Sequence, residues 1–117
     1  NDNHGHDVGD IVLKEFSNIC VEVARHQIDR VARLGGEEFV ILLPETSMDG
    51  ARILAERLRQ QCDEHVFDAM QNALRVTVSI GITEWRQDET NMEAALKRAD
   101  VALYTAKNDG RNRVVAG

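Results

Sequence analysis

The chain has 117 residues, enough to bury roughly two thirds of its unfolded surface in one core and too few for two domains, so we expect a single domain over residues 1–117. A formal net charge of −6 argues against nonspecific nucleic-acid binding, which needs a basic surface to neutralise phosphates. No apolar run approaches the roughly 20 residues of a membrane-spanning helix. We therefore expect a cytoplasmic domain that has no membrane segment in this chain and does not bind nucleic acid, with membrane anchoring of the parent protein left open.

The first predicted element is an amphipathic helix from about Asp7 to Arg25. Cys20 in this helix and Cys62 in the next both fall within amphipathic patterns, so we expect buried free thiols rather than a disulfide or a metal pair. The apolar residues that recur at helical spacing along the first helix are Val8, Ile11, Val12, Phe16, Ile19 and Val23.

A β-hairpin is predicted next, around the sequence RLGGEEF at 33–39. A short run of β character ends at Leu34, and an apolar run at 39–43 is stopped by Pro44, which predicts two strands joined by a tight turn. The glycines of the turn supply positive φ and, lacking Cβ atoms, leave the backbone open to a bulky ligand such as a phosphate chain.

Two carboxylates, Glu37 and Glu38, follow the glycines directly. Strand alternation would send them to opposite faces, so that one could hold a metal while the other faces elsewhere. The alternative is that both belong to a solvated hairpin end.

A second helix is predicted over 47–62, with Ser47 as its N-cap. Between this helix and the next, apolar and small or polar residues alternate over 76–83, which is typical of a strand with two distinct faces.

The third helix is predicted over 90–106, because Glu93 follows Thr90 by three residues in a capping-box pattern. Gly110 lies beyond its end, where helices commonly stop, and 113–115 offers a short last strand. Helices interleaved with antiparallel strands predict an α+β fold.

The hairpin sequence resembles the signature of the GGDEF family, the diguanylate cyclases, in its GGEEF form. Arg33 stands where the family places an arginine before the turn. Three further motifs resemble the same family in the same order: NDNHGHDVGD at 1–10, TVSIGI at 77–82 and ADVALYTAKNDGRNRV at 99–114.

The resemblance implies a nucleotidyl cyclase palm, an α+β sandwich whose central, mostly antiparallel sheet is flanked by helices. In the family, the residues before the position of Asn1 form a core strand that carries a metal-binding aspartate. We therefore expect this domain to be incomplete at its N-terminus, the printed fragment to be inactive alone, and a sensory or regulatory domain to precede it in the parent protein.

The implied reaction joins two GTP molecules into cyclic di-GMP, with attack of a 3′-hydroxyl on an α-phosphorus and loss of pyrophosphate. Mg²⁺, or Mn²⁺ in its place, suits carboxylate ligation and neutralises the phosphates. By resemblance Glu37 is the metal ligand, and Glu38 is a second catalytic carboxylate near the hydroxyl or a second metal. The role of Arg33, in phosphate contact or in bracing the hairpin, stays open.

Substrate-binding residues are also implied. Guanine needs an acceptor carboxylate beside an amide, which Asp10 and Asn1 supply, and the resemblance places both on the guanine edge. Asp10 alone could equally be a first-turn charge favoured by the helix dipole. Gly35 and Gly36 would let the phosphates approach.

The pair Lys107 and Arg111 resembles the triphosphate-binding pair of the family. A compact ammonium and a forked guanidinium both suit phosphate oxygens. A solvated pair that complements the helix dipole is the alternative.

One departure of this sequence from the family pattern concerns inhibition by the product. Many family members carry an R-x-x-D motif before the turn that binds product and inhibits the enzyme, whereas here the window reads HQID at 26–29. Asp29 is kept, His26 replaces the arginine, and the adjacent Arg25 and Arg30 are expected to point elsewhere. We therefore expect a degenerate inhibitory site with weak product feedback. We also expect His26→Arg to introduce inhibition by the product.

The sequence is compatible with two alternative functions. The first is an active diguanylate cyclase that works as a homodimer, because each domain binds only one GTP. The second is a catalytically silent module that binds GTP or cyclic di-GMP and signals through a partner.

Overall fold

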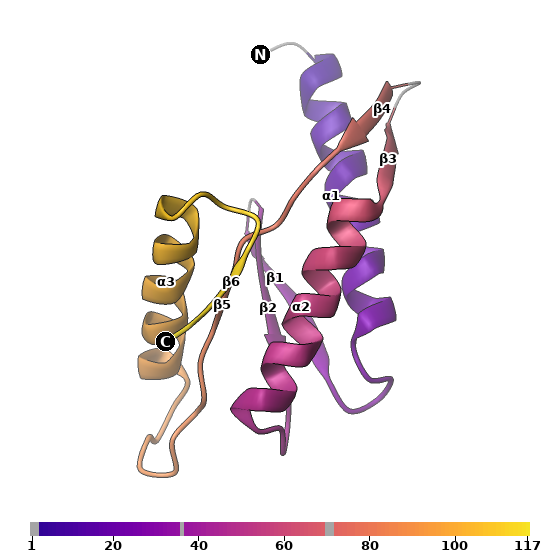
Figure 1. Ribbon diagram of the computed structural model, residues 1–117. Helices are drawn as coiled ribbons and strands as arrows, with labels where there is room; N and C mark the ends of the chain where they lie inside the picture. The colour runs from indigo at the N-terminus through magenta and orange to yellow at the C-terminus, as the bar shows by residue number, and fades with distance from the viewer. Residues whose placement is uncertain (1–2, 36, 70–71) are drawn as a thin grey trace.

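The computed structural model describes residues 3–35, 37–69 and 72–117 (Figure 1). Its helices and strands confirm the α+β class. In chain order they are α1 (Asn3–Val23), β1 (Arg30–Gly35), β2 (Glu38–Leu42), α2 (Met48–Glu64), β3 (Val66–Ala69), β4 (Asn72–Arg75), β5 (Ile80–Ile82), α3 (Glu93–Asn108) and β6 (Val114–Ala116).

The strands of the described residues form three two-stranded sheets: β1 with β2, β3 with β4, and β5 with β6. The first two pairs are antiparallel, but β5 and β6 run parallel, with Ile80 opposite Val114. A parallel pair needs a long crossover connection, and α3 supplies it. The expected central sheet is thus represented by separate pairs, one of which is parallel.

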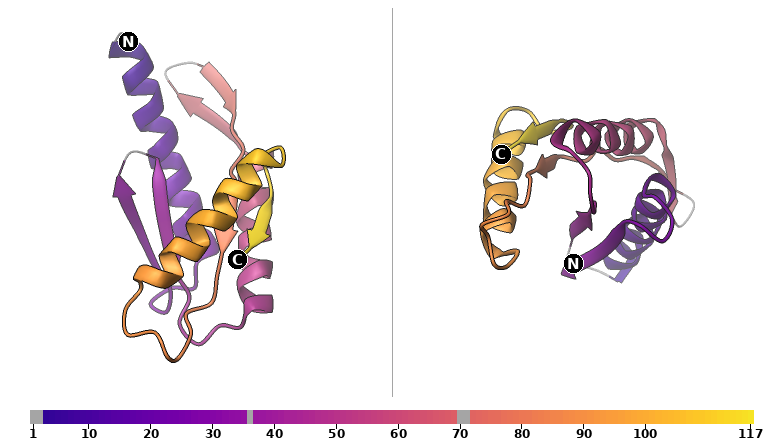
Figure 2. Two further views of the ribbon diagram at one scale, coloured as in Figure 1. Left: turned by 90° about the vertical axis from the view of Figure 1, so that its left-hand side faces the viewer. Right: turned by 90° about the horizontal axis from the view of Figure 1, so that it is seen from below.

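Seen from below, the elements follow an open ring (Figure 2). One end of the ring consists of α3 with β5 and β6, α2 lies in the middle, and α1 with the β1–β2 hairpin forms the other end. Among the helices of the described ranges, none has the length and apolar character that a membrane crossing requires.

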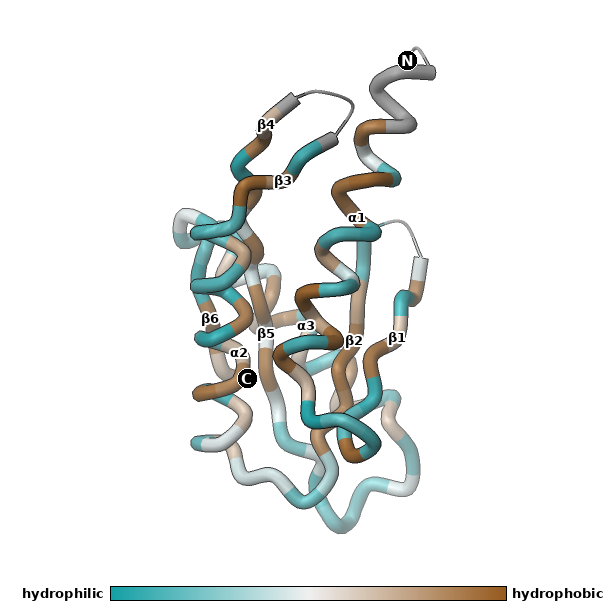
Figure 3. The backbone as a smooth tube through the Cα atoms, turned by 90° about the vertical axis from the view of Figure 1, so that its right-hand side faces the viewer, coloured by the Kyte–Doolittle hydropathy of each residue, from teal (hydrophilic) through white to brown (hydrophobic). Residues whose placement is uncertain are grey.

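The core lies where α1 packs against α2, and the apolar stripe of α1 lies on its inner side (Figure 3). Cys20 and Cys62 are both buried free cysteines, as predicted. Burial raises the pKa of the Cys20 thiol to about 12 and that of Cys62 to about 11, so both stay protonated at neutral pH. The buried core residues are Ile19, Cys20, Val23, Leu58, Cys62 and Phe67.

Helix starts were predicted with mixed success. Ser47 caps α2 as predicted, its Oγ accepting the Gly50 N–H at 3.2 Å. The capping box at Thr90 is wrong, because α3 begins only at Glu93, whose N–H donates to Asn91 Oδ1 at 2.9 Å. Asn91, one residue after the predicted start, provides an acceptor closer to the helix.

The tight packing of β5 against α3 depends on Gly81 on β5. A Cβ at this position would overlap the carbonyl oxygen of Ala99 and lie 2.5 Å from the amide nitrogen of Leu103, both in α3. Only glycine therefore lets β5 lie this close to the helix backbone.

Arg98 of α3 holds the segment that leads from β5 to α3. Its guanidinium donates to Glu89 Oε2 at 2.8 Å, to the Glu84 carbonyl at 2.7 Å and to Thr83 Oγ1 at 3.1 Å. Hydrogen bonding to this guanidinium lowers the pKa of Glu89 to about 2. This network fixes α3, which carries Lys107, relative to β5.

Candidate active site

The glycine turn lies at the tip of the β1–β2 hairpin. Gly35 pairs with Glu38, so the turn comes after Gly35 and includes Glu37, one position later than predicted. The shift arises from a register irregularity between Arg33 and Gly35 on β1. Gly36 lies outside the described residues.

The backbone at Gly35 is open to a ligand. Its φ is +153°, and apart from its chain neighbours no heavy atom lies within 4 Å of the place that a Cβ would take. The expectation that this turn can admit a bulky group is therefore compatible with the geometry.

Both candidate carboxylates, Glu37 and Glu38, are exposed at the hairpin tip. Glu38 begins β2, so it lies on the strand face opposite to Phe39, whose ring packs edge-to-face on Phe16 of α1 at 5.0 Å. Glu37 lies in the turn, where strand alternation does not apply.

A site for Mg²⁺ or Mn²⁺ would depend on the carboxylates at the hairpin tip. Among the described residues, no group of three or more histidine, cysteine, aspartate or glutamate side chains could hold a metal ion. Mg²⁺ is commonly held by one or two carboxylates, with phosphate oxygens and waters completing the shell. Glu37 and Glu38 fit that arrangement as the carboxylate part of a site that a phosphate substrate completes.

A cavity of about 390 Å³ opens between α1 and the hairpin. Its size falls within the range of small-molecule pockets, and it combines apolar side chains with charged ones. Asp10 is an exposed member of the lining, whereas Asn1 lies outside the described residues. The lining residues are Asp10, Leu13, Lys14, Ser17, Val31, Arg33 and Phe39.

Three of these lining residues, Leu13, Lys14 and Ser17, were missed in the sequence. They follow Asp10 by three, four and seven positions, the spacing at which residues share one helix face. That spacing could have identified them once Asp10 was placed in the first helix.

Lys107 and Arg111 lie at the C-terminal end of α3, both exposed. As predicted, the helix stops before Gly110, which has a φ of +123°. The Arg111 N–H donates to the Ala106 carbonyl at 2.9 Å, the bond that closes a Schellman motif. In Figure 1 this helix end lies at about the same height as the end of β1.

The predicted orientation of Arg25 is wrong, because its side chain points toward Asp29. The guanidinium of Arg25 donates to Asp29 Oδ1 at 2.7 Å and the Arg25 amide donates to Asp29 Oδ2 at 2.7 Å. Arg25 also donates to Thr46 Oγ1 at 2.6 Å.

The Asp29 side chain is fully buried under these contacts, while His26 is exposed in the same turn. Hydrogen bonding to Arg25 lowers the pKa of Asp29. The carboxylate therefore braces a turn instead of facing solvent.

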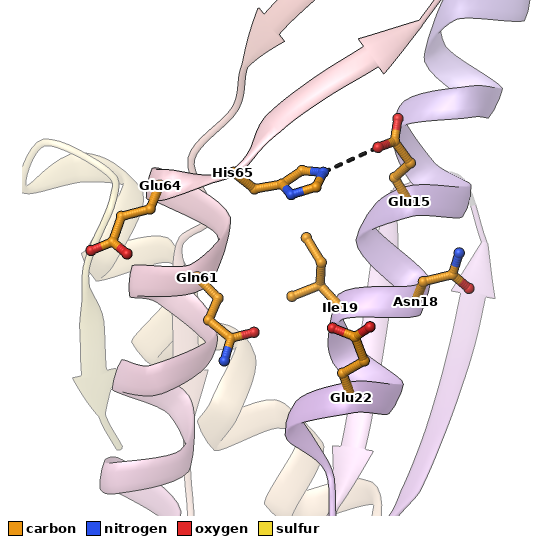
Figure 4. Close-up of a pocket in the computed structure, with 7 residues that line it drawn as sticks. All are labelled: Glu15, Asn18, Ile19, Glu22, Gln61, Glu64 and His65. Atoms are coloured by element: carbon orange, nitrogen blue, oxygen red, sulfur yellow. Dashed lines mark hydrogen bonds and ion pairs between the residues drawn. The ribbon is translucent and has the colours of Figure 1, made fainter.

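A second cavity, of about 350 Å³, lies between α1 and α2 (Figure 4). Glu15, Glu22 and Glu64 line it, and His65 Nε2 lies 3.1 Å from Glu15 Oε1. Three carboxylates repel a triphosphate, so this groove is a poorer nucleotide site than the pocket beside the hairpin.

The profile of the family described as "Diguanylate cyclase, GGDEF domain" matches residues 1–113. The chain belongs to the GGDEF family. It is 41% identical over 114 residues to Diguanylate cyclase A of Treponema denticola, covering 97% of this chain and 30% of that protein. It is 43% identical over 117 residues to the response regulator PleD of Caulobacter vibrioides, covering 98% of this chain and 26% of that protein. The chain thus spans less than a third of either relative.

Solved structures agree on the fold. The diguanylate cyclase SiaD of Pseudomonas aeruginosa, crystallised with its activator SiaC, matches with a TM-score of 0.90 and 39% identity over 100% of this chain and 44% of its own. The active GGEEF domain of a diguanylate cyclase from Vibrio cholerae matches with a TM-score of 0.86 and 35% identity, covering 99% of this chain and 72% of that one.

Proposed function

We propose that this chain belongs to the catalytic domain of a diguanylate cyclase, which condenses two GTP into cyclic di-GMP and releases two pyrophosphates. The observation that carries the proposal is the Gly-Gly-Glu-Glu turn, open at Gly35 and adjacent to a pocket lined by Asp10. Relatives named diguanylate cyclases, at about 40% identity, support it.

Guanine would enter the pocket between α1 and the hairpin. The Asp10 carboxylate would accept from the N1–H and N2–H donors of the base, and the Asn1 amide would contact the same edge. Leu13, Val31 and Phe39 supply an apolar surface for the ring. Specificity for guanine over adenine follows, because adenine lacks the N1–H donor that a carboxylate requires.

The phosphates would extend toward the open backbone of Gly35 and toward Gly36, with Lys107 and Arg111 neutralising the charge of the phosphate chain. The attacking 3′-oxygen forms a bond to the α-phosphorus of the second GTP, the bond to the bridging oxygen breaks, and pyrophosphate leaves. The same step with the roles exchanged closes the ring.

Glu37 would hold the Mg²⁺ or Mn²⁺ ion, and Glu38 would stand near the attacking hydroxyl. When bound, the cation neutralises phosphate charge and lowers the pKa of the hydroxyl. Because one domain holds one GTP, two copies must face each other, and we propose a homodimer as the active form. We also propose a cytoplasmic location and a regulatory domain in the parent protein.

The test uses the full-length protein with GTP and Mg²⁺, and chromatography to identify the products. We expect cyclic di-GMP and pyrophosphate from GTP and no cyclic product from ATP. Binding of GTP without product, at concentrations where the protein is dimeric, would instead favour the silent module that signals through a partner.

Product feedback is expected to be weak. Arg25 donates hydrogen bonds to both oxygens of the buried Asp29. This carboxylate therefore cannot bind a ligand without breaking its contacts with Arg25. For the same reason His26→Arg should add little inhibition by itself, less than the sequence alone suggests. Initial rates measured against added cyclic di-GMP, with a pyrophosphate readout, test both statements. Strong noncompetitive inhibition of the parent that disappears in Asp29→Asn would contradict them.

A further inference from the structure

The loop that follows α3 carries Arg111, and its next residue, Asn112, is held from two other elements. Asn112 Oδ1 accepts from Arg59 Nη1 of α2 at 2.9 Å. The backbone N–H of Asn112 donates to Ser79 Oγ at 3.2 Å, on the segment that leads into β5. The loop is therefore tied to α2 and to the approach to β5 at one residue.

The backbone of this loop requires such support. Arg111 has a φ of +64° and Asn112 a φ of +47°, so two consecutive residues other than glycine adopt the left-handed region. That region is unfavourable for most side chains and least so for asparagine and aspartate, and it persists where surrounding contacts determine it. Without the contacts at Asn112, the left-handed backbone at Arg111 and Asn112 would lose the support that α2 and the approach to β5 provide.

Arg59 is suited to hold a fixed position. Its side chain is only 17% exposed, and its Nη2 lies 2.6 Å from Glu56 Oε1 one turn earlier. Asp63 Oδ2 lies 3.9 Å from Nη1. With its fork anchored on α2, the guanidinium presents one N–H to Asn112 from a rigid element.

We propose that Arg59 is a positioning residue for the nucleotide site: acting through Asn112, it fixes the direction in which Arg111 presents its guanidinium beside Lys107. Arg59 lies outside every motif that the sequence analysis singled out, and it touches no substrate in this scheme. The inference rests on the proposed function, because it assumes that Arg111 contacts the phosphates of GTP.

The experiment is a double-mutant cycle in the full-length protein, with steady-state kinetics for GTP and thermal unfolding of each variant. Arg59→Ala should raise KM for GTP about 5-fold and change kcat less than about 2-fold, because phosphate binding is weakened while the reacting centre is intact. In an Arg111→Ala background the same change should leave KM unaltered, since the group that it positions is gone. Arg52→Ala, on an exposed position of the same helix, is the matched control and should behave as the parent.

A second pair of variants keeps the test independent of the stability of Arg59→Ala. Asn112→Asp retains both an acceptor for Arg59 and tolerance of the left-handed backbone, so its KM should stay near that of the parent. Asn112→Ala should reproduce the KM of Arg59→Ala.

The outcomes separate the two proposals. An active parent in which Arg59→Ala leaves KM unchanged, or in which the KM effects of Arg59→Ala and Arg111→Ala multiply independently, would overturn the positioning role alone. A parent that neither binds a nonhydrolysable GTP analogue nor forms product would overturn the proposed function, and the positioning role with it.

Discussion

Glu37→Gln is expected to reduce turnover at least about 1000-fold while leaving the fold intact, since a metal-binding carboxylate contributes several kcal/mol to the transition state. In the proposed mechanism, the charge that Glu37 would supply is required mainly when negative charge develops on the transferring phosphoryl group. Glutamine has nearly the same shape, and the position is exposed at a turn, so stability should change by less than about 0.5 kcal/mol. Product formation per minute and circular dichroism of the purified variant are the two measurements.

The control for this experiment is Glu22→Gln, which makes the same substitution at an exposed carboxylate on α1. It should retain the turnover of the parent. Turnover of Glu37→Gln within about tenfold of the parent would remove Glu37 from the role of metal ligand.

Gly81→Ala is expected to destabilise the protein by more than about 3 kcal/mol, because no side-chain rotation can relieve an overlap with backbone atoms. The added carbon meets the Ala99 carbonyl oxygen and the Leu103 amide nitrogen, so β5 and α3 must separate to accept it. Urea unfolding followed by circular dichroism gives the difference in free energy.

Gly9→Ala on α1 is the matched control for Gly81→Ala. A Cβ at Gly9 would meet no heavy atom within 4 Å, and alanine is the better helix former by roughly 1 kcal/mol. Equal or increased stability is therefore expected. A neutral Gly81→Ala would mean that the close approach of β5 to α3 does not hold in solution.

The helices were predictable because each buries an apolar stripe with the 3.6-residue period. The β3–β4 hairpin was not, since the sequence MQ between Ala69 and Asn72 contains none of the glycine, asparagine or proline residues that mark tight turns. Alternation over 76–83 predicted a strand, but within this stretch only 80–82 is paired, as β5. A ladder requires a neighbouring strand as well as a pattern, and within the described residues 76–79 belongs to no strand pair.

The candidate site, like the fold, was predictable from the sequence only in part. The glycine turn and the end of α3 follow from local chemistry, which a sequence displays directly. The contact of Arg25 with Asp29 depends on the conformation of a loop. The contact of Arg59 with Asn112 depends on how two elements distant in the sequence pack together. The roles of Glu37, Glu38, Asp10, Lys107 and Arg111 stay predictions until the variants are measured.

The sequestered thiols of Cys20 and Cys62 make the domain convenient for spectroscopy. Alkylating reagents attack the thiolate, and these two cysteines are buried and protonated at neutral pH. A single cysteine introduced at an exposed surface position could therefore be labelled with a fluorophore in the folded wild-type background, without first replacing the native pair. With two such cysteines, one on the hairpin and one at the end of α3, the distance between these elements would become measurable as nucleotide is added.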